Sequence, residues 1–155
     1  MRFAYADPPY IGQARKLYAC SEIDHAALVE RLLAEYPDGW PTLGMVLRLC
    51  PPDVRVGAWV KPFASFKPGV NPAYAWEPVV FRGGRTKRAR SEPTVRDWVS
   101  VSITLKKGLT GAKPRAFAEW IVEFLGAQPG DTIDDLFPGT GACGVVFTQR
   151  TEVSA

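Results

Sequence analysis

Four consecutive residues near the start of the sequence, Asp7, Pro8, Pro9 and Tyr10, could hold an amino group in place for chemistry. Two successive prolines fix φ and remove two N–H donors, so the Pro8 carbonyl has one direction beside the Asp7 carboxylate. Two such acceptors suit a primary amino group on an aromatic ring, because its lone pair must be localised before nitrogen can attack carbon. Tyr10 adds a face on which an extruded base can stack. The alternative is a proline-rich turn that Asp7 only caps.

A second segment of chemical interest is Gly139 to Gly144, Gly-Thr-Gly-Ala-Cys-Gly, which fits the pattern G-x-G-x-x-G. Glycine is needed where the backbone takes positive φ or approaches a ligand closely, and a following helix offers unpaired N–H groups. A tight strand-to-helix turn without a ligand would use the same glycines. A Walker-type phosphate loop is excluded because no Lys follows, and a dinucleotide site needs an acid about 20 residues on, where only Glu152 follows the glycines.

Short apolar segments precede both motifs and predict the strands that position them. Residues 3–6 lead into Asp7, and residues 132–137 lead into the glycine segment.

The remaining elements follow from periodicity and from helix-ending residues. Residues 24–36 form an amphipathic helix with Ser21 and Asp24 as candidate caps, and we expect His25 at its surface. A second helix begins at Pro114 and ends at Gly126. The strands at 54–60 and 79–81 pair across a proline-rich loop, and 99–105 forms a further strand. Residues 42–49 fit a strand or a short helix.

Length and composition favour a single domain over residues 1–155. A chain of 155 residues with 46% hydrophobic side chains has room for one core and no separate substrate domain. It contains no apolar segment long enough for a membrane span and no signal-peptide core at its start, so we expect a cytoplasmic location. Three cysteines and one histidine are too few for a disulfide scaffold or a zinc site, and we expect no metal.

Positive charge is concentrated in a basic region, residues 55–107. It contains eleven Lys or Arg and three acidic residues, so the rest of the chain is net acidic. Such a distribution is typical of a surface that contacts phosphates, although a solvated loop has the same composition. The candidate nucleic-acid contacts are Arg82, Arg85, Lys87, Arg88 and Arg90.

Three motifs together resemble one enzyme family. "ADPPY" resembles the catalytic motif of S-adenosylmethionine-dependent amino-methyltransferases that modify adenine or cytosine in DNA, and "DDLFPGTG" is similar to their cofactor motif. "KP" followed by a helix and "PGD" resembles the segment before the cofactor motif in circularly permuted members, whose catalytic motif comes first. "AWVKP" and "WEPVVF" resemble the hairpin region of small phage and actinobacterial versions. The motifs span residues 7 to 144.

This resemblance implies an α/β fold, a reduced and circularly permuted Rossmann-like methyltransferase, in which the strands at 3–6 and 132–137 lie side by side. Their carboxyl ends would then place Asp7 and Gly139 on opposite sides of one crevice. It also implies that Asp7 and the Pro8 carbonyl accept hydrogen bonds from the target amino group, that Pro9 completes the rigid catalytic motif (7–10), and that Tyr10 stacks on the base. Adenine is favoured over cytosine because Asp at the position of Asp7 is more frequent in the adenine enzymes. S-adenosylmethionine would lie against residues of the "KP" segment and of the cofactor motif (135–144): Lys113, Pro114, Asp135, Phe137, Gly139, Thr140 and Gly141.

Two rival functions stay open at the level of sequence. A catalytically inactive relative could keep the fold and bind nucleic acid or a partner protein through the basic region. A nicotinamide-dependent oxidoreductase would explain the glycine pattern but not the Asp-Pro-Pro-Tyr motif. The sequence also leaves open RNA in place of DNA and a homo-oligomeric state.

Overall fold

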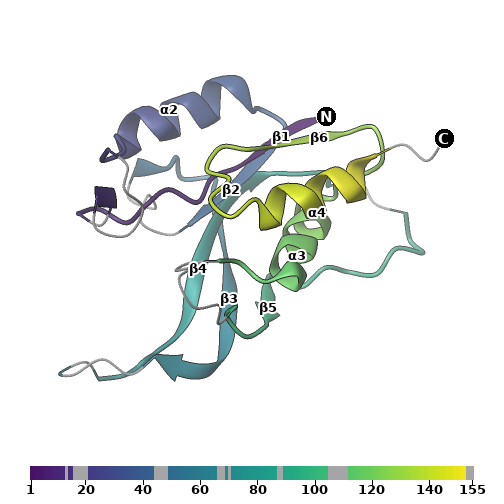
Figure 1. Ribbon diagram of the computed structural model, residues 1–155. Helices are drawn as coiled ribbons and strands as arrows, with labels where there is room; N and C mark the ends of the chain where they lie inside the picture. The colour runs from purple at the N-terminus through teal and green to yellow at the C-terminus, as the bar shows by residue number, and fades with distance from the viewer. Residues whose placement is uncertain are drawn as a thin grey trace.

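A computed structural model of the chain describes residues 1–12, 14–15, 21–43, 49–65, 69, 71–86, 89–104 and 112–152. Within these residues lie three helices and six strands (Figure 1). The helices are α2 (His25–Glu35), α3 (Arg115–Leu125) and α4 (Ala142–Thr151). The strands are β1 (Arg2–Tyr5), β2 (Gly39–Leu43), β3 (Arg55–Ser65), β4 (Tyr74–Gly83), β5 (Trp98–Ser100) and β6 (Thr132–Asp135).

The strands form two sheets that meet at one point. β1 pairs with β6 in parallel, which confirms the predicted pairing of the two strands that precede the motifs. The other sheet has the order β2-β4-β3-β5, with antiparallel pairs around β4 and a parallel pair between β3 and β5. A parallel bridge from Ala6 to Thr42 connects them, and the Ala6 N–H donates to the Pro41 carbonyl over 3.1 Å. β1 therefore lies between β6 and β2.

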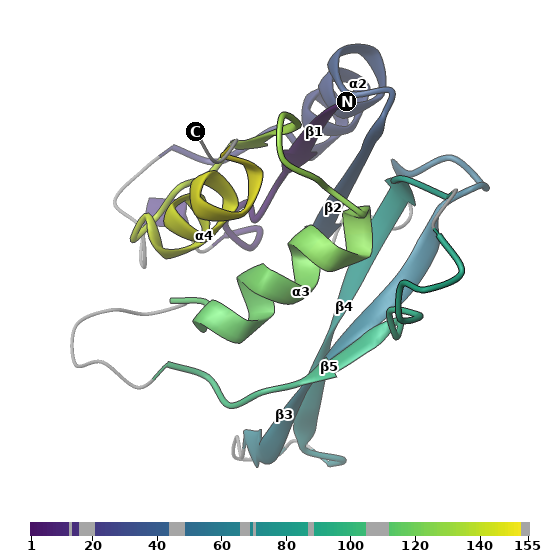
Figure 2. The ribbon, with the colours of Figure 1, turned by 90° about the vertical axis from the view of Figure 1, so that its right-hand side faces the viewer.

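Helices cover both faces of this arrangement because β1 is apolar on both sides. Phe3 and Tyr5 join the core cluster of α3 and α4, whereas Ala4 and Ala6 join the cluster under α2. Successive side chains of a strand point to opposite faces, so two apolar sides require two layers of helices. Figure 2 shows α3 lying across the β3–β4 hairpin with α4 beside it. The mixed α/β, Rossmann-like class predicted from the sequence is confirmed.

The helix ends follow the predicted signals. Asp24 caps α2, and its Oδ1 accepts from the N–H groups of Ala26 and Ala27 over 2.9 and 3.1 Å. Gly126 ends α3 in the left-handed region at φ 66°, which glycine adopts at little cost. The surface position expected for His25 is wrong. His25 is buried because it continues the stripe of Leu28 and Leu32 on the inner face of α2.

Two strand predictions change in extent. The hairpin of β3 and β4 is confirmed. Of the predicted strand 99–105, β5 (Trp98–Ser100) includes 99 and 100 but not 101–104, because it pairs with three residues of β3, Ala58 to Val60, and residue 105 lies outside the described part of the chain. Residues 42–49 fit a strand or a short helix by sequence; in the structure residues 42 and 43 end β2, which begins at Gly39, and residues 44–48 lie outside the described part of the chain. Among the described residues, no helix combines the length and apolar character needed to cross a bilayer.

Candidate active site

The two sequence motifs leave the sheet at the same edge. Tyr5 is the register partner of Asp135, and the Leu136 N–H donates to the Tyr5 carbonyl over 3.0 Å. Because the strands are parallel, the segment beginning at Asp7 and the glycine turn both start at the carboxyl end of this pair. In the Asp-Pro-Pro-Tyr segment, Pro8 is buried, and Tyr10 at the end is 41% exposed.

The Asp7 carboxylate forms an ion pair with Lys113 from the segment just before α3. Lys113 Nζ lies 2.5 Å from Asp7 Oδ2, and the two side chains are 10% and 21% exposed. Burial raises the pKa of Asp7, Lys113 opposes that rise, and the negative charge of Glu77 adds to it. Asp7 is thus a shielded carboxylate paired with the ammonium group of Lys113.

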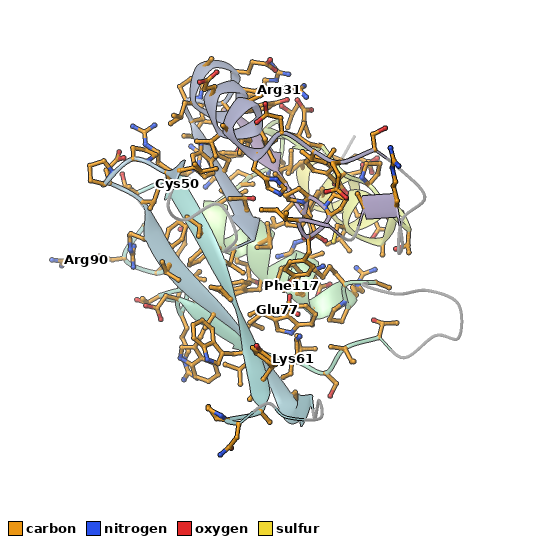
Figure 3. The ribbon with its side chains drawn as sticks, turned by 90° about the vertical axis from the view of Figure 1, so that its left-hand side faces the viewer. Arg31, Cys50, Lys61, Glu77, Arg90 and Phe117 are labelled. Atoms are coloured by element: carbon orange, nitrogen blue, oxygen red, sulfur yellow. The ribbon has the colours of Figure 1, made fainter. Side chains whose placement is uncertain are left out.

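The wall beside this pair comes from the β3–β4 hairpin. Trp59 is buried and donates from Nε1 to the Val101 carbonyl over 2.8 Å. The ammonium groups of Lys61 and Lys113 lie 5.1 and 5.8 Å from the centroid of its ring. Lys61 also forms an ion pair with Glu77 on the neighbouring strand, and Figure 3 shows these two side chains close together on the hairpin.

Sequence reasoning missed this wall. Trp59 and Lys61 are two residues apart on β3, and Glu77 is the register partner of Trp59, so all three share the face of the hairpin that packs under α3. Charged residues on the core-facing side of a strand were the available signal, since such residues are rarely buried without a partner.

Asp135, at the end of β6, has one satisfied oxygen and one unsatisfied oxygen. Oδ1 accepts from the Phe137 N–H over 3.3 Å. Oδ2 is buried and accepts no hydrogen bond from the part of the chain that the structure describes. Burial raises the pKa of Asp135, and the nearby Asp7 raises it further, against the effects of the Phe137 N–H and Lys113. A buried acceptor without a donor indicates that the donor comes from a ligand or from water.

The glycine turn that follows has open space around it. Gly139 and Gly141 have φ of 47° and 73°, and a Cβ on Gly141 would meet no atom within 4 Å. Gly141 is also the N-cap of α4 and provides no side chain to the N–H groups of the first turn. Thr140 between them is exposed. These glycines are therefore required by the backbone conformation and not by tight packing, and the turn leaves donors and room for a ligand.

The elements that surround the turn bring most of the predicted cofactor residues together. Phe137 is half-buried between Asp135 and the turn, and Pro114 is the N-cap of α3, directly after Lys113. The first turn of α4 lies over Asp135, where a Cβ on Gly144 would be 3.8 Å from Oδ2. Glu152 follows the last turn of α4, roughly 15 Å from the glycine turn at 1.5 Å per helical residue.

The predicted nucleic-acid residues lie elsewhere. Arg82 pairs with Asp53, and Arg85 pairs with Asp131 and donates to the Gly126 carbonyl, beside the amino end of β1 and β6. Figure 3 shows Arg90 projecting outward. Lys87 and Arg88 lie outside the described residues. Arg85 and Arg90, together with Arg55 and Arg96, line a groove to which Trp98 and Phe124 also contribute.

The thiol of Cys143 lies beside this site. Cys143, in the first turn of α4, is buried, and burial raises its pKa to about 12. Its thiol is therefore uncharged at neutral pH. The described residues contain no group of three or more His, Cys, Asp or Glu side chains placed to bind a metal ion.

Comparison with known proteins gives likeness at the level of structure alone. No protein-family model matches the chain, and no curated protein sequence matches it. The crystal structure of the M1.HpyAVI–SAM complex has a TM-score of 0.61 and 16% identity, over 99% of this chain and 84% of that chain. A second crystal structure of M1.HpyAVI has a TM-score of 0.58 and 14% identity, over 97% of this chain and 76% of that chain. The chain thus has a fold resembling that of a DNA methyltransferase.

Proposed function

We propose that this chain transfers a methyl group from S-adenosylmethionine to the exocyclic amino group of adenine in DNA. The observation that carries the proposal is the pairing of β1 with β6, from which the Asp-Pro-Pro-Tyr segment and the glycine turn leave the sheet together. A methyl transfer between two bound molecules requires that their sites adjoin, because the reacting nitrogen and carbon must come within about 3 to 3.5 Å. The structural likeness to the M1.HpyAVI–SAM complex supports the same assignment.

The residues at the end of β6 fit the methyl donor. The unsatisfied Oδ2 of Asp135 suits an ammonium donor, and the uncapped N–H groups of α4 suit acceptor atoms. Phe137 and Pro114 add apolar surface, and Gly139, Thr140 and Gly141 form the turn that approaches the ligand. When bound, S-adenosylmethionine supplies an electrophilic methyl carbon on a cationic sulfur that leaves as a neutral thioether.

The residues after β1 act on the acceptor nitrogen. Asp7 and the Pro8 carbonyl accept its two N–H hydrogens, which turns its lone pair out of the ring plane and toward the methyl carbon. The nitrogen–carbon bond forms as the carbon–sulfur bond breaks. Nitrogen gains positive charge, both acceptors bind it more strongly, and one proton leaves along the hydrogen bond to Asp7 and then to water. Tyr10 stacks on the extruded base, and Pro9 keeps the segment rigid.

The test is incubation of the protein with labelled S-adenosylmethionine and unmethylated DNA. Asp7→Ala should lower incorporation by about a hundredfold or more, the usual effect of removing one group that stabilises charge in a transition state. Glu35→Ala is the matched control, because Glu35 is an exposed carboxylate that pairs with Arg31 on α2. Equal incorporation by wild type and Asp7→Ala would reject the catalytic role of Asp7.

Two further measurements separate the alternatives. Digestion of the methylated product distinguishes N6-methyladenine from N4-methylcytosine. A parallel reaction with RNA of the same sequence tests whether the substrate is RNA in place of DNA. Calorimetry with S-adenosylmethionine tests the rival in which the chain is an inactive relative that binds nucleic acid. A protein of that kind should bind DNA but give no heat with the methyl donor.

A further inference from the structure

We propose that Lys113 is a positioning residue for Asp7: its ammonium group occupies Oδ2 and keeps the carboxyl group ionised, so that Oδ1 stays available to the target amino group. This inference rests on the proposed methyl transfer. It assigns the ammonium group a task toward the base side of the site, whereas the family resemblance implied a place beside the cofactor.

The contact between Lys113 and Asp7 is a close and largely buried ion pair. Lys113 Nζ is 2.5 Å from Asp7 Oδ2, and both side chains are largely withdrawn from water. A lysine ammonium is strongly hydrated, and its burial is unfavourable unless an opposite charge replaces the lost water. The contact joins residues 106 positions apart, so it also connects α3 to the end of β1.

The backbone around Lys113 directs the side chain to this place. Pro114, the N-cap of α3, has φ −69° and ψ 151°. Proline disfavours helical conformations for the residue before it, so Lys113 cannot be included in α3 and stays in an extended segment. From there its ammonium lies 5.8 Å from the ring centroid of Trp59, which is buried and cannot move aside readily.

The charges around Asp7 explain why a cation is needed. Glu77 on β4 and Asp135 on β6 are both negative neighbours, and Lys61 on β3 is engaged with Glu77. Tyr5 on β1 and Cys143 on α4 face the same region as neutral groups, because burial raises the pKa of both. Without Lys113, burial and two negative charges would all favour a protonated Asp7.

A protonated Asp7 would be unsuitable for the proposed reaction. A neutral carboxyl group carries a donor on one oxygen and is a weaker acceptor on the other, so it would hold the amino group less tightly. It also could not receive the proton that nitrogen loses. Lys113 therefore acts through Asp7 and needs no contact with the base.

The experiment compares Lys113→Met with Lys113→Arg and with Arg115→Met. Arg115 is two residues away and forms an exposed pair with Glu119, so its substitution removes one positive charge outside the site. The first readout is the titration of the Asp7 carboxyl carbon by NMR in the protein without ligands. The second is the pH profile of kcat/KM for methyl transfer to DNA.

In Lys113→Met we expect Asp7 to lose its proton at higher pH than in the wild type. Methyl transfer near neutral pH should fall by roughly tenfold to a hundredfold, because only the ionised fraction of Asp7 can accept the proton, and should recover as pH rises. Lys113→Arg should restore most of the wild-type titration, and Arg115→Met should leave both readouts unchanged. A merely structural role for Lys113 would lower activity equally at every pH.

An Asp7 titration that is the same in Lys113→Met and in the wild type would overturn the proposal. If the wild type transfers no methyl group to DNA, the proposed function fails, and the NMR titration still decides whether Lys113 controls the ionisation of Asp7. If Lys113→Met does not fold, Lys113→Gln serves in its place, because the amide keeps a hydrogen bond to Asp7 without a charge.

Discussion

The pKa values of the carboxyl groups at the two ends of the β1–β6 pair are shifted in opposite directions. At the amino end, Asp131 accepts from the terminal ammonium of Met1 over 2.8 Å, from Arg85 over 2.7 Å and from the Gln128 N–H over 2.8 Å. Burial alone would raise the pKa of Asp131, but these donors outweigh burial and lower the pKa to about 2. At the carboxyl end, burial raises the pKa of Asp7 and Asp135.

This difference separates stabilising polar groups from functional ones within a single strand pair. A carboxylate with three donors contributes to the folded state, whereas a buried carboxylate with too few donors costs stability until a ligand arrives. The glycines follow the same division. At Gly83, on the amino-end side, a Cβ would lie 2.6 Å from the Asp38 carbonyl oxygen, whereas the space around Gly141 is empty.

The largest effect is expected from Asp131→Asn, which removes the carboxylate that accepts three hydrogen bonds at the amino end of the β1–β6 pair. The variant should lose about 2 to 3 kcal/mol of unfolding free energy at pH 7, because it leaves Arg85 and the terminal ammonium without their shared partner. Since the folded pKa of Asp131 is about 2, this contribution is complete above pH 3.8 and is lost as pH falls toward 2. Urea unfolding at pH 7 and near pH 2 measures it.

The control for this prediction is Glu119→Gln, which removes an exposed charge paired with Arg115 on α3. We expect a change below about 0.5 kcal/mol, typical of a surface pair. All variants are prepared without residues added before Met1, so that the contact between its ammonium group and Asp131 is the same in each. A loss in Asp131→Asn that is equally large at pH 2 would show that packing, and not charge, stabilises this end.

The next largest effect is a difference in the stability lost when a glycine at each end is replaced by alanine. Gly83→Ala should destabilise by about 2 kcal/mol, because φ is 71° and the new methyl group would meet the Asp38 backbone. Gly141→Ala should cost about 1 kcal/mol, since only the positive φ opposes it. Thermal unfolding of both variants checks the order, and calorimetry should show weaker binding of S-adenosylmethionine to Gly141→Ala alone. Equal destabilisation by the two substitutions would contradict the separation between a structural glycine at the amino end and a functional glycine at the carboxyl end.

The sequence was sufficient for the parts of the site that depend on local patterns. The strands before Asp7 and Gly139 and the end of α3 at Gly126 follow from short signals, whereas the pairing of the two strands follows from the family resemblance. The Asp7–Lys113 contact did not follow, because it joins residues 106 positions apart and no periodicity specifies such a pair. Arg85 was assigned to a nucleic-acid surface by charge, which cannot distinguish a solvated arginine from one that an aspartate holds.

The smallest effect, and the one of opposite sign, is expected from Asp135→Asn at the unsatisfied end. The variant should gain about 0.5 to 1 kcal/mol at pH 7, a typical gain when a functional group that costs stability is replaced. Because burial raises the folded pKa of Asp135, the ionised wild type is penalised at neutral pH, and the penalty vanishes as pH falls below 3.8. Differential scanning calorimetry at pH 7 and pH 3 measures both.

Asp134→Asn is the control for this gain, because the neighbouring carboxylate points outward and accepts from Arg2 and Tyr36 over 2.8 and 2.9 Å. Its loss should lower stability slightly, by less than about 1 kcal/mol. Adjacent aspartates would then have effects of opposite sign, as expected if the buried Oδ2 of Asp135 lacks a donor within the protein. A loss of stability in Asp135→Asn would mean that this carboxylate already has its hydrogen-bond donors. The acceptor for the ammonium group of the cofactor would then have to lie elsewhere along the glycine turn.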